Sequence, residues 1–337
     1  MTTKKKKKKA RRRVALVLVS LLSLIFFCTG GGLLYVNNLL NKLDRTKPSG
    51  TGSLPSGIFD QSTDDELRRQ LDDAQNMNML QEKGIENILL IGSDSRGSDT
   101  GRSDAMMILS INHDTHKIHM VSLMRAMYVC IPTNQGNAWF LLNSAYSWGG
   151  TDLLINTIQT NFRVHIDHYV TVDFNSFTQI IDLIGGVEIT LTQGECNVMA
   201  SEYFTLAEPG THLLTGAQAL AYSRVRYTDN DFVRTSRQRT VMTKVIEKAK
   251  TMNVLQLANL ANQIFPLVGT DMSNSEILSY VANMGTLLNY PVSQMMLPVE
   301  NQDGEHYVGI MTLADGSEAY QVDFKNNITE LQRFLKE

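Results

Sequence analysis

The sequence predicts a mixed α/β domain, in which helices flank a central β-sheet, behind one N-terminal transmembrane helix. From Ile85 onward, short apolar runs alternate with helical patterns, which is typical of a sheet covered on its faces. Before this region, Val14–Val36 carries no charge and is long enough to cross a bilayer as a helix. With 43 % hydrophobic and 19 % charged residues, the chain has the composition of a packed protein rather than a disordered one.

The basic residues are concentrated at the N-terminus. Met1–Arg13 contains six lysines, three arginines and no acid, whereas the remainder has 22 basic against 34 acidic side chains, a net charge of −12. Positive charge beside a span stays in the cytoplasm, so we expect a single-pass cell-membrane protein whose C-terminal body is extracytoplasmic. No small-residue cleavage site follows the apolar core, which favours an uncleaved anchor over a signal peptide. An acidic body argues against nucleic acid as a partner, and the cytoplasmic segment lacks room for a DNA-recognition element.

Four segments are expected along the chain. They are a cytoplasmic basic segment (1–13), the transmembrane helix (14–36), an extracytoplasmic linker with a juxtamembrane helix (37–84), and a catalytic domain (85–337). The linker is rich in Gly, Ser and Pro, and Thr63–Lys83 within it is charged and weakly periodic like a helix.

The domain itself divides into strands and helices. Strands are expected at Asn87–Gly92, Ala105–Ile111, Lys117–Leu123, His168–Asp173 and Val187–Leu191. Helices are expected at Asp152–Phe162, Phe174–Ile184, Gly216–Val225, Phe232–Met252, Ser275–Leu288 and Asp323–Leu335. The short turn between the second and third strands makes that pair antiparallel, so the sheet is mixed. Cys28 falls in the span, and Cys130 and Cys196 are either a disulfide pair or two buried thiols.

Two acidic residues stand at neighbouring ends of the first two expected strands. Asp94 follows the first strand and Asp104 opens the second, and two carboxylates at one end of a sheet can share a hard divalent cation. Arg96 and Arg102 alternate with them, which indicates an anionic ligand such as a phosphate or pyrophosphate. On their own, two such aspartates more commonly cap turns. Arg125, which ends the third strand, joins this group only if strand order places it beside the aspartates.

A second cluster lies on the helix expected at Phe232–Met252. At about 100° per residue, Arg234 and Gln238 extend the apolar stripe formed by Val241 and Val245. A buried arginine is costly unless it is paired, so an internal anion is its natural partner, and helix N-termini favour anions as well. A salt-bridge network with the neighbouring acids Asp229 and Asp231 is the alternative.

Other polar residues are expected to be solvated. Arg239 lies about 140° from Arg234 around the same helix, which predicts a surface position. His113, His116 and His119 recur every third residue in and beside a turn, whereas helical zinc motifs place two histidines one turn apart. We therefore interpret the three histidines as part of a solvated turn.

These clusters, in this order behind one anchor, resemble the LytR-CpsA-Psr family of extracytoplasmic cell-wall enzymes from Gram-positive bacteria. The matching stretches are Asn87–Arg96, Gly101–Ile108, Ser122–Arg125, Leu142–Tyr146 with Gly149–Gly150, Gly216–Arg226 and Asp231–Gln238. They span about Asn87–Met252, and Met311–Phe334 is similar to the C-terminal part of the family more loosely. The resemblance implies the three-layer domain of that family.

The resemblance also implies an activity. Family members are phosphotransferases that move an anionic glycopolymer, such as teichoic acid or capsular polysaccharide, from undecaprenyl pyrophosphate to peptidoglycan, generally to the C6 hydroxyl of N-acetylmuramic acid. By this resemblance Asp94 and Asp104 hold Mg²⁺ (or Mn²⁺). The pyrophosphate-binding residues are then Arg96, Arg102, Arg125, Arg224, Arg226, Arg234 and Gln238, and the catalytic residues are Arg125, Arg224, Asp231 and Arg234. Asp231 either orients or deprotonates the acceptor hydroxyl, or it positions Arg234. The lipid tail is expected in an apolar pocket between the sheet and the helices.

One position departs from the family pattern. The family usually has Pro-Arg-Asp where this chain has Met124, Arg125 and Ala126. Without that aspartate, Arg125 lacks an orienting partner, which predicts either lowered activity or a protein that binds the lipid without turning it over. A non-catalytic or regulatory binder of polyprenyl-pyrophosphate-linked saccharide is therefore the alternative function.

Overall fold

The computed structural model describes residues 38, 40–50, 65–94, 101–201, 208–225, 231–299, 308–313 and 316–337. Residues Asp44–Glu337 form one compact unit, and Met1–Leu43 form another, which is described only at residues 38 and 40–43. The span expected at Val14–Val36 lies outside the described residues. Within the described part, no helix combines the length and the apolar character that crossing a bilayer requires.

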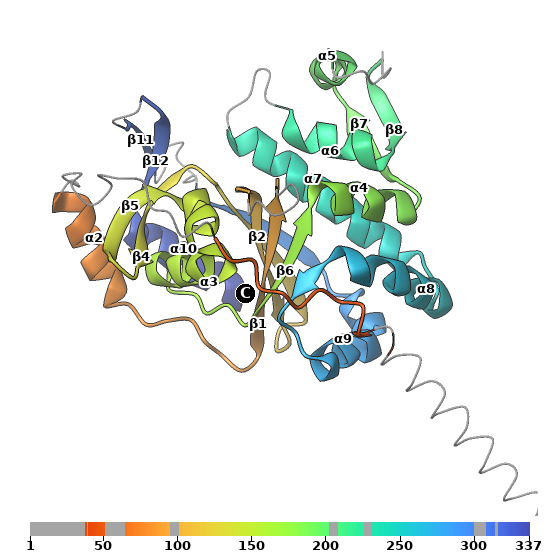
Figure 1. Ribbon diagram of the computed structural model, residues 1–337, viewed down its shortest axis with the longest axis horizontal. Helices are drawn as coiled ribbons and strands as arrows, with labels where there is room; N and C mark the ends of the chain where they lie inside the picture. Colours follow the sequence, from red (N-terminus) through yellow and green to blue (C-terminus); the bar gives the residue numbers. More distant parts are fainter. Residues whose placement is uncertain are drawn as a thin grey trace, which may run out of the picture. The chain divides into compact units, whose positions relative to one another are not determined.

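A six-stranded mixed sheet forms the centre of the larger unit (Figure 1). In spatial order its strands are β10 (Val292–Leu297), β3 (Lys117–Leu123), β2 (Ser103–Asn112), β1 (Ile85–Ser93), β6 (His168–Asp173) and β9 (Gly269–Thr270). The neighbours β1, β2 and β3 are antiparallel, as the short turn predicted. In contrast, β6 lies parallel to β1, and β10 lies parallel to β3. The prediction of an α/β fold with a mixed central sheet is confirmed.

Each face of this sheet carries its own layer of helices, because successive side chains of a strand point to opposite faces. On β1, Leu89 and Ile91 are buried in the main core with residues of three helices. These helices are α2 (Asp65–Gln75), α3 (Leu142–Phe162) and α10 (Phe324–Lys336). Leu90 and Gly92 border a cavity under the helices of the other face. Those helices are α4 (Phe174–Leu183), α6 (Gly216–Arg224) and α7 (Asp231–Lys250).

Helix α3 begins at Leu142, ten residues before the expected Asp152. It consists of two helical segments that are joined across a break at Gly150. Gly150 has a φ of 67°, a value that side-chain-bearing residues rarely adopt. A Cβ on Gly150 would lie 1.9 Å from the carbonyl oxygen of Pro48, where the segment 44–50 crosses the helix. The break therefore lets the start of the compact unit pack closely on α3.

Two smaller sheets complete the unit. A four-stranded sheet has the order β11 (Val308–Thr312), β12 (Glu318–Val322), β4 (Met127–Thr133) and β5 (Gly136–Leu141), and it packs on α3. The hairpin of β7 (Val187–Leu191) and β8 (Gly210–Leu214) packs with α5 (Gln193–Ser201) and α6 around a second core. Helix α8 (Val254–Ile264), the short η1 (Phe265–Leu267) and α9 (Asn274–Leu287) lie at the β9 edge of the central sheet.

The structure shows that the two cysteines are free thiols and that one histidine expected to be solvated is buried. Cys130 and Cys196 are both free and buried, so the thiol alternative is correct, and burial raises the pKa of Cys130 to about 11. His119 is 1 % exposed inside β3 and packs edge-on against Phe334, so its expected place in a solvated turn is wrong. His119 lies within the strand expected at Lys117–Leu123, which is β3, and it is buried there because Phe334 of α10 packs on its ring.

Candidate active site

The two aspartates lie at the same end of the β1–β2 pair. Asp94 follows β1, and its carboxylate accepts a hydrogen bond of 2.5 Å from the backbone N–H of Arg102. The N–H of Asp94 in turn donates to the carbonyl oxygen of Arg102 at 3.2 Å. Asp104 stands near the start of β2, where the pairing of Gly92 with Ala105 brings it beside the end of β1. The antiparallel ladder therefore gathers both acids at one edge.

Strand register also brings Arg125 to this edge. Leu123 pairs with Met106, so Arg125, which follows β3, lies next to Asp104, which precedes Met106. Its Nη1 donates to Asp104 Oδ1 at 2.9 Å, and its Nε lies 3.6 Å from Asp231 Oδ2. Strand order therefore places Arg125 beside Asp104, one of the two aspartates named in the condition for its relevance.

The first turn of helix α7 contributes two more charged residues to this edge, Asp231 and Arg234. Arg234 is 4 % exposed, and its Nη2 donates to the carbonyl oxygen of Asp104 at 3.1 Å. Its Nη1 lies 3.9 Å from Asp231 Oδ1. Asp104, Arg125, Asp231 and Arg234 thus form one network in which two guanidinium groups face two carboxylates.

An apolar cavity of ≈ 230 Å³ opens beside this network. The sheet contributes Leu90, Met107, Val170 and Val172, and the helices contribute Phe177, Ile181, Val241 and Val245. Polar groups of Asp104, Arg224, Arg234 and Gln238 also line it. The stripe predicted for α7, with Arg234 and Gln238 continuing Val241 and Val245, therefore faces a cavity rather than closed core. An apolar chain with an anionic head group is complementary to this combination.

Local contacts hold Arg224 at the cavity. Helix α6 starts with a capping box between Thr215 and Gln218, and the N–H of Gly216 donates to Asp182 Oδ1 at 2.7 Å, which ties α6 to the end of α4. At the other end of α6, the guanidinium carbon of Arg224 lies 5.0 Å from the centre of the Phe174 ring. Such a cation–π contact holds the charge in place while leaving its N–H donors available to a ligand.

The structure does not describe every residue of the predicted site. Asp104, Arg125, Asp231 and Arg234 are brought together, and Arg224 and Gln238 line the adjoining cavity. Asp94 and Arg102 are joined at the strand ends, with the Arg102 side chain exposed. Arg96 and Arg226 lie outside the described residues.

Asp94 and Asp104 carry the oxygen donors that Mg²⁺ prefers. Within the described residues, no group of three or more His, Cys, Asp or Glu side chains is arranged to hold a metal. Mg²⁺ does not require such a cage, because it commonly binds one or two carboxylates together with substrate phosphates and water. Asp94 and Asp104 offer oxygen donors of the right chemistry, although Asp104 Oδ1 is also bonded to Arg125.

The arginines after Arg234 have different surroundings. Arg237 forms a buried ion pair with Glu195, with Nε and Oε1 at 2.7 Å, so it belongs to the second core. Arg239 is half-buried, its Nε and Nη1 have no hydrogen-bond partner among the described residues, and loss of hydration lowers its pKa. The surface position expected for Arg239 is wrong because this side of α7 also packs on the sheet, where Thr243 accepts a hydrogen bond from Gln294.

Two aromatic residues at the site were not predicted from the sequence. Phe174 supports Arg224, and Tyr320 on β12 lies beside Asp231 and Arg125. Burial, followed by the nearby Asp231 carboxylate, raises the pKa of the Tyr320 hydroxyl, which therefore stays protonated at neutral pH. The first position of the expected helix at Phe174 was the available signal for that residue, whereas the strand that carries Tyr320 was not predicted.

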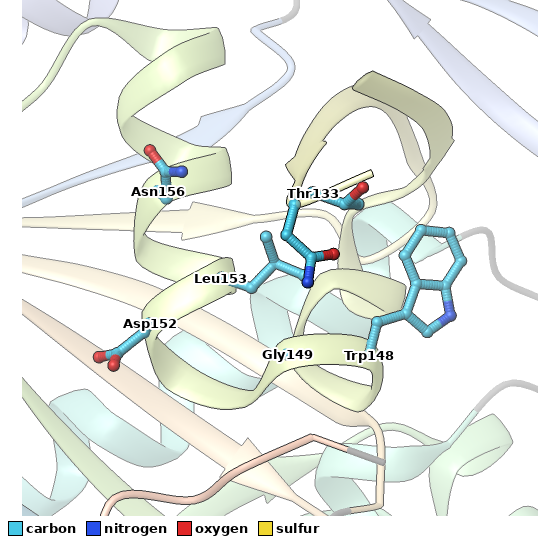
Figure 2. A pocket seen from close by; sticks show the side chains of 7 residues that line it. Thr133, Trp148, Gly149, Asp152, Leu153 and Asn156 are labelled. Carbon is cyan, nitrogen blue, oxygen red and sulfur yellow. The ribbon is translucent and has the colours of Figure 1, made fainter. Parts of the chain in front are cut away.

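A second pocket, of ≈ 380 Å³, lies between α3 and the β4–β5 turn. Figure 2 shows Leu153 and the Trp148 ring on either side of it, with Asp152 and Asn156 along α3. Asp152 is paired with Lys47 at 3.1 Å. None of the residues that line this pocket is an arginine, so it lacks the anion-binding groups of the first cavity.

Comparison with known proteins identifies the family. The family model for LytR_cpsA_psr matches residues 57–333. This chain belongs to the LytR-CpsA-Psr family.

Two relatives and one solved structure illustrate its range. Biofilm regulatory protein A of Streptococcus mutans is 32 % identical over 265 residues, which cover 74 % of this chain and 62 % of that protein. The polyisoprenyl-teichoic acid–peptidoglycan teichoic acid transferase TagU of Bacillus mycoides is 36 % identical over 170 residues, 50 % of this chain and 54 % of that protein. The chain thus spans less than two thirds of either relative. The structure of Bacillus subtilis YwtF (TagT) with bound octaprenyl pyrophosphate lipid has a TM-score of 0.59 at 21 % identity, over 78 % of this chain and 97 % of that one, which establishes a shared fold.

Proposed function

We propose that this LytR-CpsA-Psr protein is a membrane-anchored phosphotransferase that moves an anionic glycopolymer from undecaprenyl pyrophosphate to peptidoglycan outside the cell. The polymer would be of the teichoic acid or capsular polysaccharide type. The observation that carries the proposal is the apolar cavity with Arg224, Arg234 and Gln238 in its lining, because this combination suits a lipid tail joined to a diphosphate. The teichoic acid transferase name of TagU and the octaprenyl pyrophosphate bound to TagT support the same class.

The proposed reaction is a single phosphoryl displacement. The acceptor hydroxyl oxygen bonds to the phosphorus that carries the glycopolymer, while the bond from that phosphorus to the bridging oxygen breaks. Polyprenyl phosphate leaves with the electron pair, and the hydroxyl proton passes to a base. Such transfers depend mainly on alignment and charge neutralisation.

The residues of the network have distinct roles in this scheme. Arg125 and Arg234 bind phosphate oxygens through guanidinium forks, which fixes the diphosphate and offsets its charge. Asp231, within 3.9 Å of both arginines, orients the hydroxyl or accepts its proton. Asp94 and Asp104 would hold Mg²⁺ (or Mn²⁺), which supplies Lewis-acid polarisation of the pyrophosphate and stabilises the departing phosphate.

A transfer assay with full-length protein tests the proposal. The protein in vesicles receives a polyprenyl-pyrophosphate-linked glycopolymer and peptidoglycan with Mg²⁺, and released polyprenyl phosphate and wall-linked polymer are both measured. We expect Arg234→Gln to abolish both signals, and Arg333→Gln to leave them intact because Arg333 is an exposed residue of α10 paired with Glu330. Equal activity of the two variants, or no transfer by wild type, would contradict the proposal.

A regulatory or non-catalytic binder of the same lipid-linked saccharide is the alternative, and Ala126 is the observation that favours it. The carbonyl oxygen of Ala126 accepts a hydrogen bond from the N–H of Tyr320 at 2.9 Å, so its backbone is held, but its methyl group adds no third carboxylate to Asp104 and Asp231, which contact Arg125. The name of the Streptococcus mutans relative is also a regulatory one. This alternative predicts saturable binding without release of polyprenyl phosphate, and release in the Ala126→Asp variant.

A further inference from the structure

The segment that follows α7 is almost free of charge. Residues 251–299 contain Asp271 and Glu276 as their only charged side chains, whereas 19 % of the whole chain is charged. Helix α8 consists entirely of apolar residues, asparagine and glutamine, and Glu276 is the one charged residue of α9. A soluble surface normally mixes charges of both signs, so this composition is unusual for exposed helices.

These helices are exposed. In the described residues of α8 no side chain is buried, and in α9 only Ile277 is. Leu255 is 71 % exposed, Val281 48 % and Leu278 37 %. Among the described residues, three of the seven exposed large apolar side chains lie on this pair of helices, and the other four lie singly on α4, α7, β8 and β11. A concentration of exposed apolar groups marks an interaction surface rather than chance.

The surface lies where the compact unit begins. The backbone of Asp44 pairs with β9, with its carbonyl oxygen 3.1 Å from the N–H of Thr270. The guanidinium of Arg45 donates to the carbonyl oxygen of Met272 and to the side chain of Asn274 at the start of α9. The first residues of the unit are therefore fixed between α8 and α9, at the β9 edge of the sheet (Figure 1).

Few residues separate the expected transmembrane span from the compact unit. The span expected from the sequence ends at Val36, eight residues before Asp44. At roughly 3.6 Å per extended residue, these residues reach about 29 Å at most. An anchor at Val14–Val36 therefore keeps the β9 edge, with α8 and α9, within that distance of the membrane.

We propose that α8 and α9 form a membrane-contact surface that inserts Leu255, Leu278 and Val281 into the outer surface of the lipid bilayer. Interfacial helices bind through apolar burial and through attraction of basic residues to anionic lipids, and here only the first is available because neither helix has a Lys or Arg. The contact is therefore insensitive to the anionic lipid content. The inference rests on the membrane anchorage included in the proposed function and is independent of the transfer chemistry.

Such a contact would bring the cavity close to its lipid substrate. Helix α4, which contributes Phe174 and Phe177 to the cavity, packs against α8. A bilayer held against α8 therefore lies one helix away from the cavity. A polyprenyl chain then has a short path from the membrane to the apolar lining.

Site-specific photo-crosslinking of the full-length chain tests this surface. Benzoylphenylalanine replaces Leu255 or Val281 in protein reconstituted into phosphatidylethanolamine–phosphatidylglycerol vesicles, and lipid adducts are measured by mass spectrometry. Matched controls carry the probe at Leu213 on β8 or Ile310 on β11, which are 58 % and 68 % exposed. We expect several-fold more phospholipid adducts at Leu255 and Val281 than at the controls, with no change in phosphatidylcholine vesicles. Equal adducts at all four positions, adducts to a second protein copy in place of lipid, or a yield that follows the anionic lipid content would overturn the proposal.

A charge variant provides a second measurement. Leu255→Glu combined with Val281→Glu is expected to remove the lipid adducts of a probe at position 278, whereas Leu213→Glu leaves them intact. Because all three substituted side chains are exposed, the thermal unfolding of these variants should match that of the wild type, and adducts that persist in the double variant would refute the surface. If adducts form as expected but no polymer is transferred, the proposed function fails while the membrane contact stands.

Discussion

Replacing Arg234 with methionine separates the structural and chemical contributions of the charge network. The change keeps an unbranched apolar stem but removes the guanidinium that donates to the carbonyl oxygen of Asp104 at 3.1 Å. Both nearby carboxylates retain Arg125, at 2.9 Å from Asp104 and 3.6 Å from Asp231. Stability should therefore fall by about 2 kcal/mol, the usual contribution of a hydrogen bond that involves a charged group.

The loss of transfer should be larger than the loss of stability. If Arg234 neutralises charge that develops on the pyrophosphate, its removal should lower kcat/KM on the order of 10²–10³-fold, as for other preorganised donors at a reacting centre. Urea denaturation measures the first quantity and release of polyprenyl phosphate the second. Arg234→Lys, which keeps the charge without the fork, should fall between wild type and Arg234→Met. A destabilised Arg234→Met protein that turns over at the wild-type rate would refute the assignment of Arg234 to the pyrophosphate and leave it a structural residue.

Three further predictions follow from the same structure. Asp94→Asn should lower turnover and raise the Mg²⁺ concentration for half-maximal rate; an unchanged Mg²⁺ titration would remove Asp94 from the metal site. His119 has a lowered pKa, first through burial and then through Lys117, so its neutral form is preferred in the folded state, and its contribution to stability is complete above about pH 6.5 and declines as the pH falls below that value. The unfolding free energy of His119→Phe should consequently decline less between pH 7 and pH 5 than that of wild type, and an equal decline would contradict this account. Cys130, buried and with its pKa raised to about 11, should resist thiol reagents in the native protein and react once urea unfolds it, whereas rapid native labelling would show that it is accessible.

Where local pattern decides the structure, the sequence was a reliable guide. The strands expected at Lys117–Leu123, His168–Asp173 and Val187–Leu191 match β3, β6 and β7 residue for residue. Their apolar runs are bounded by turns and helices with distinct periodicity, so their limits are visible in the chain. The arrangement of Arg234 and Gln238 on the cavity side of α7 likewise follows from helical geometry alone.

Features that depend on distant partners were not visible in the sequence. The strands β4 and β5 form a hairpin whose β4 contains Pro132, a residue that argues against a strand assignment. Tyr320 reaches the site because β12 pairs with β4 across almost 200 residues of sequence. Arg239 is half-buried on a helix that also contacts the central sheet, which the periodicity of a single helix does not indicate. In each case the determining contact is tertiary.

Helices α2 and α10 pack against each other, although they stand near opposite ends of the compact unit. The main core includes Leu67 and Leu71 from the first and Leu331 and Leu335 from the second. Contacts of such large sequence separation form late in folding, because a long loop must close before they contribute. A chain emerging from its N-terminus cannot complete this core until α10 has been made, so loss of the last turn of α10 should trap the protein in an open, protease-sensitive state.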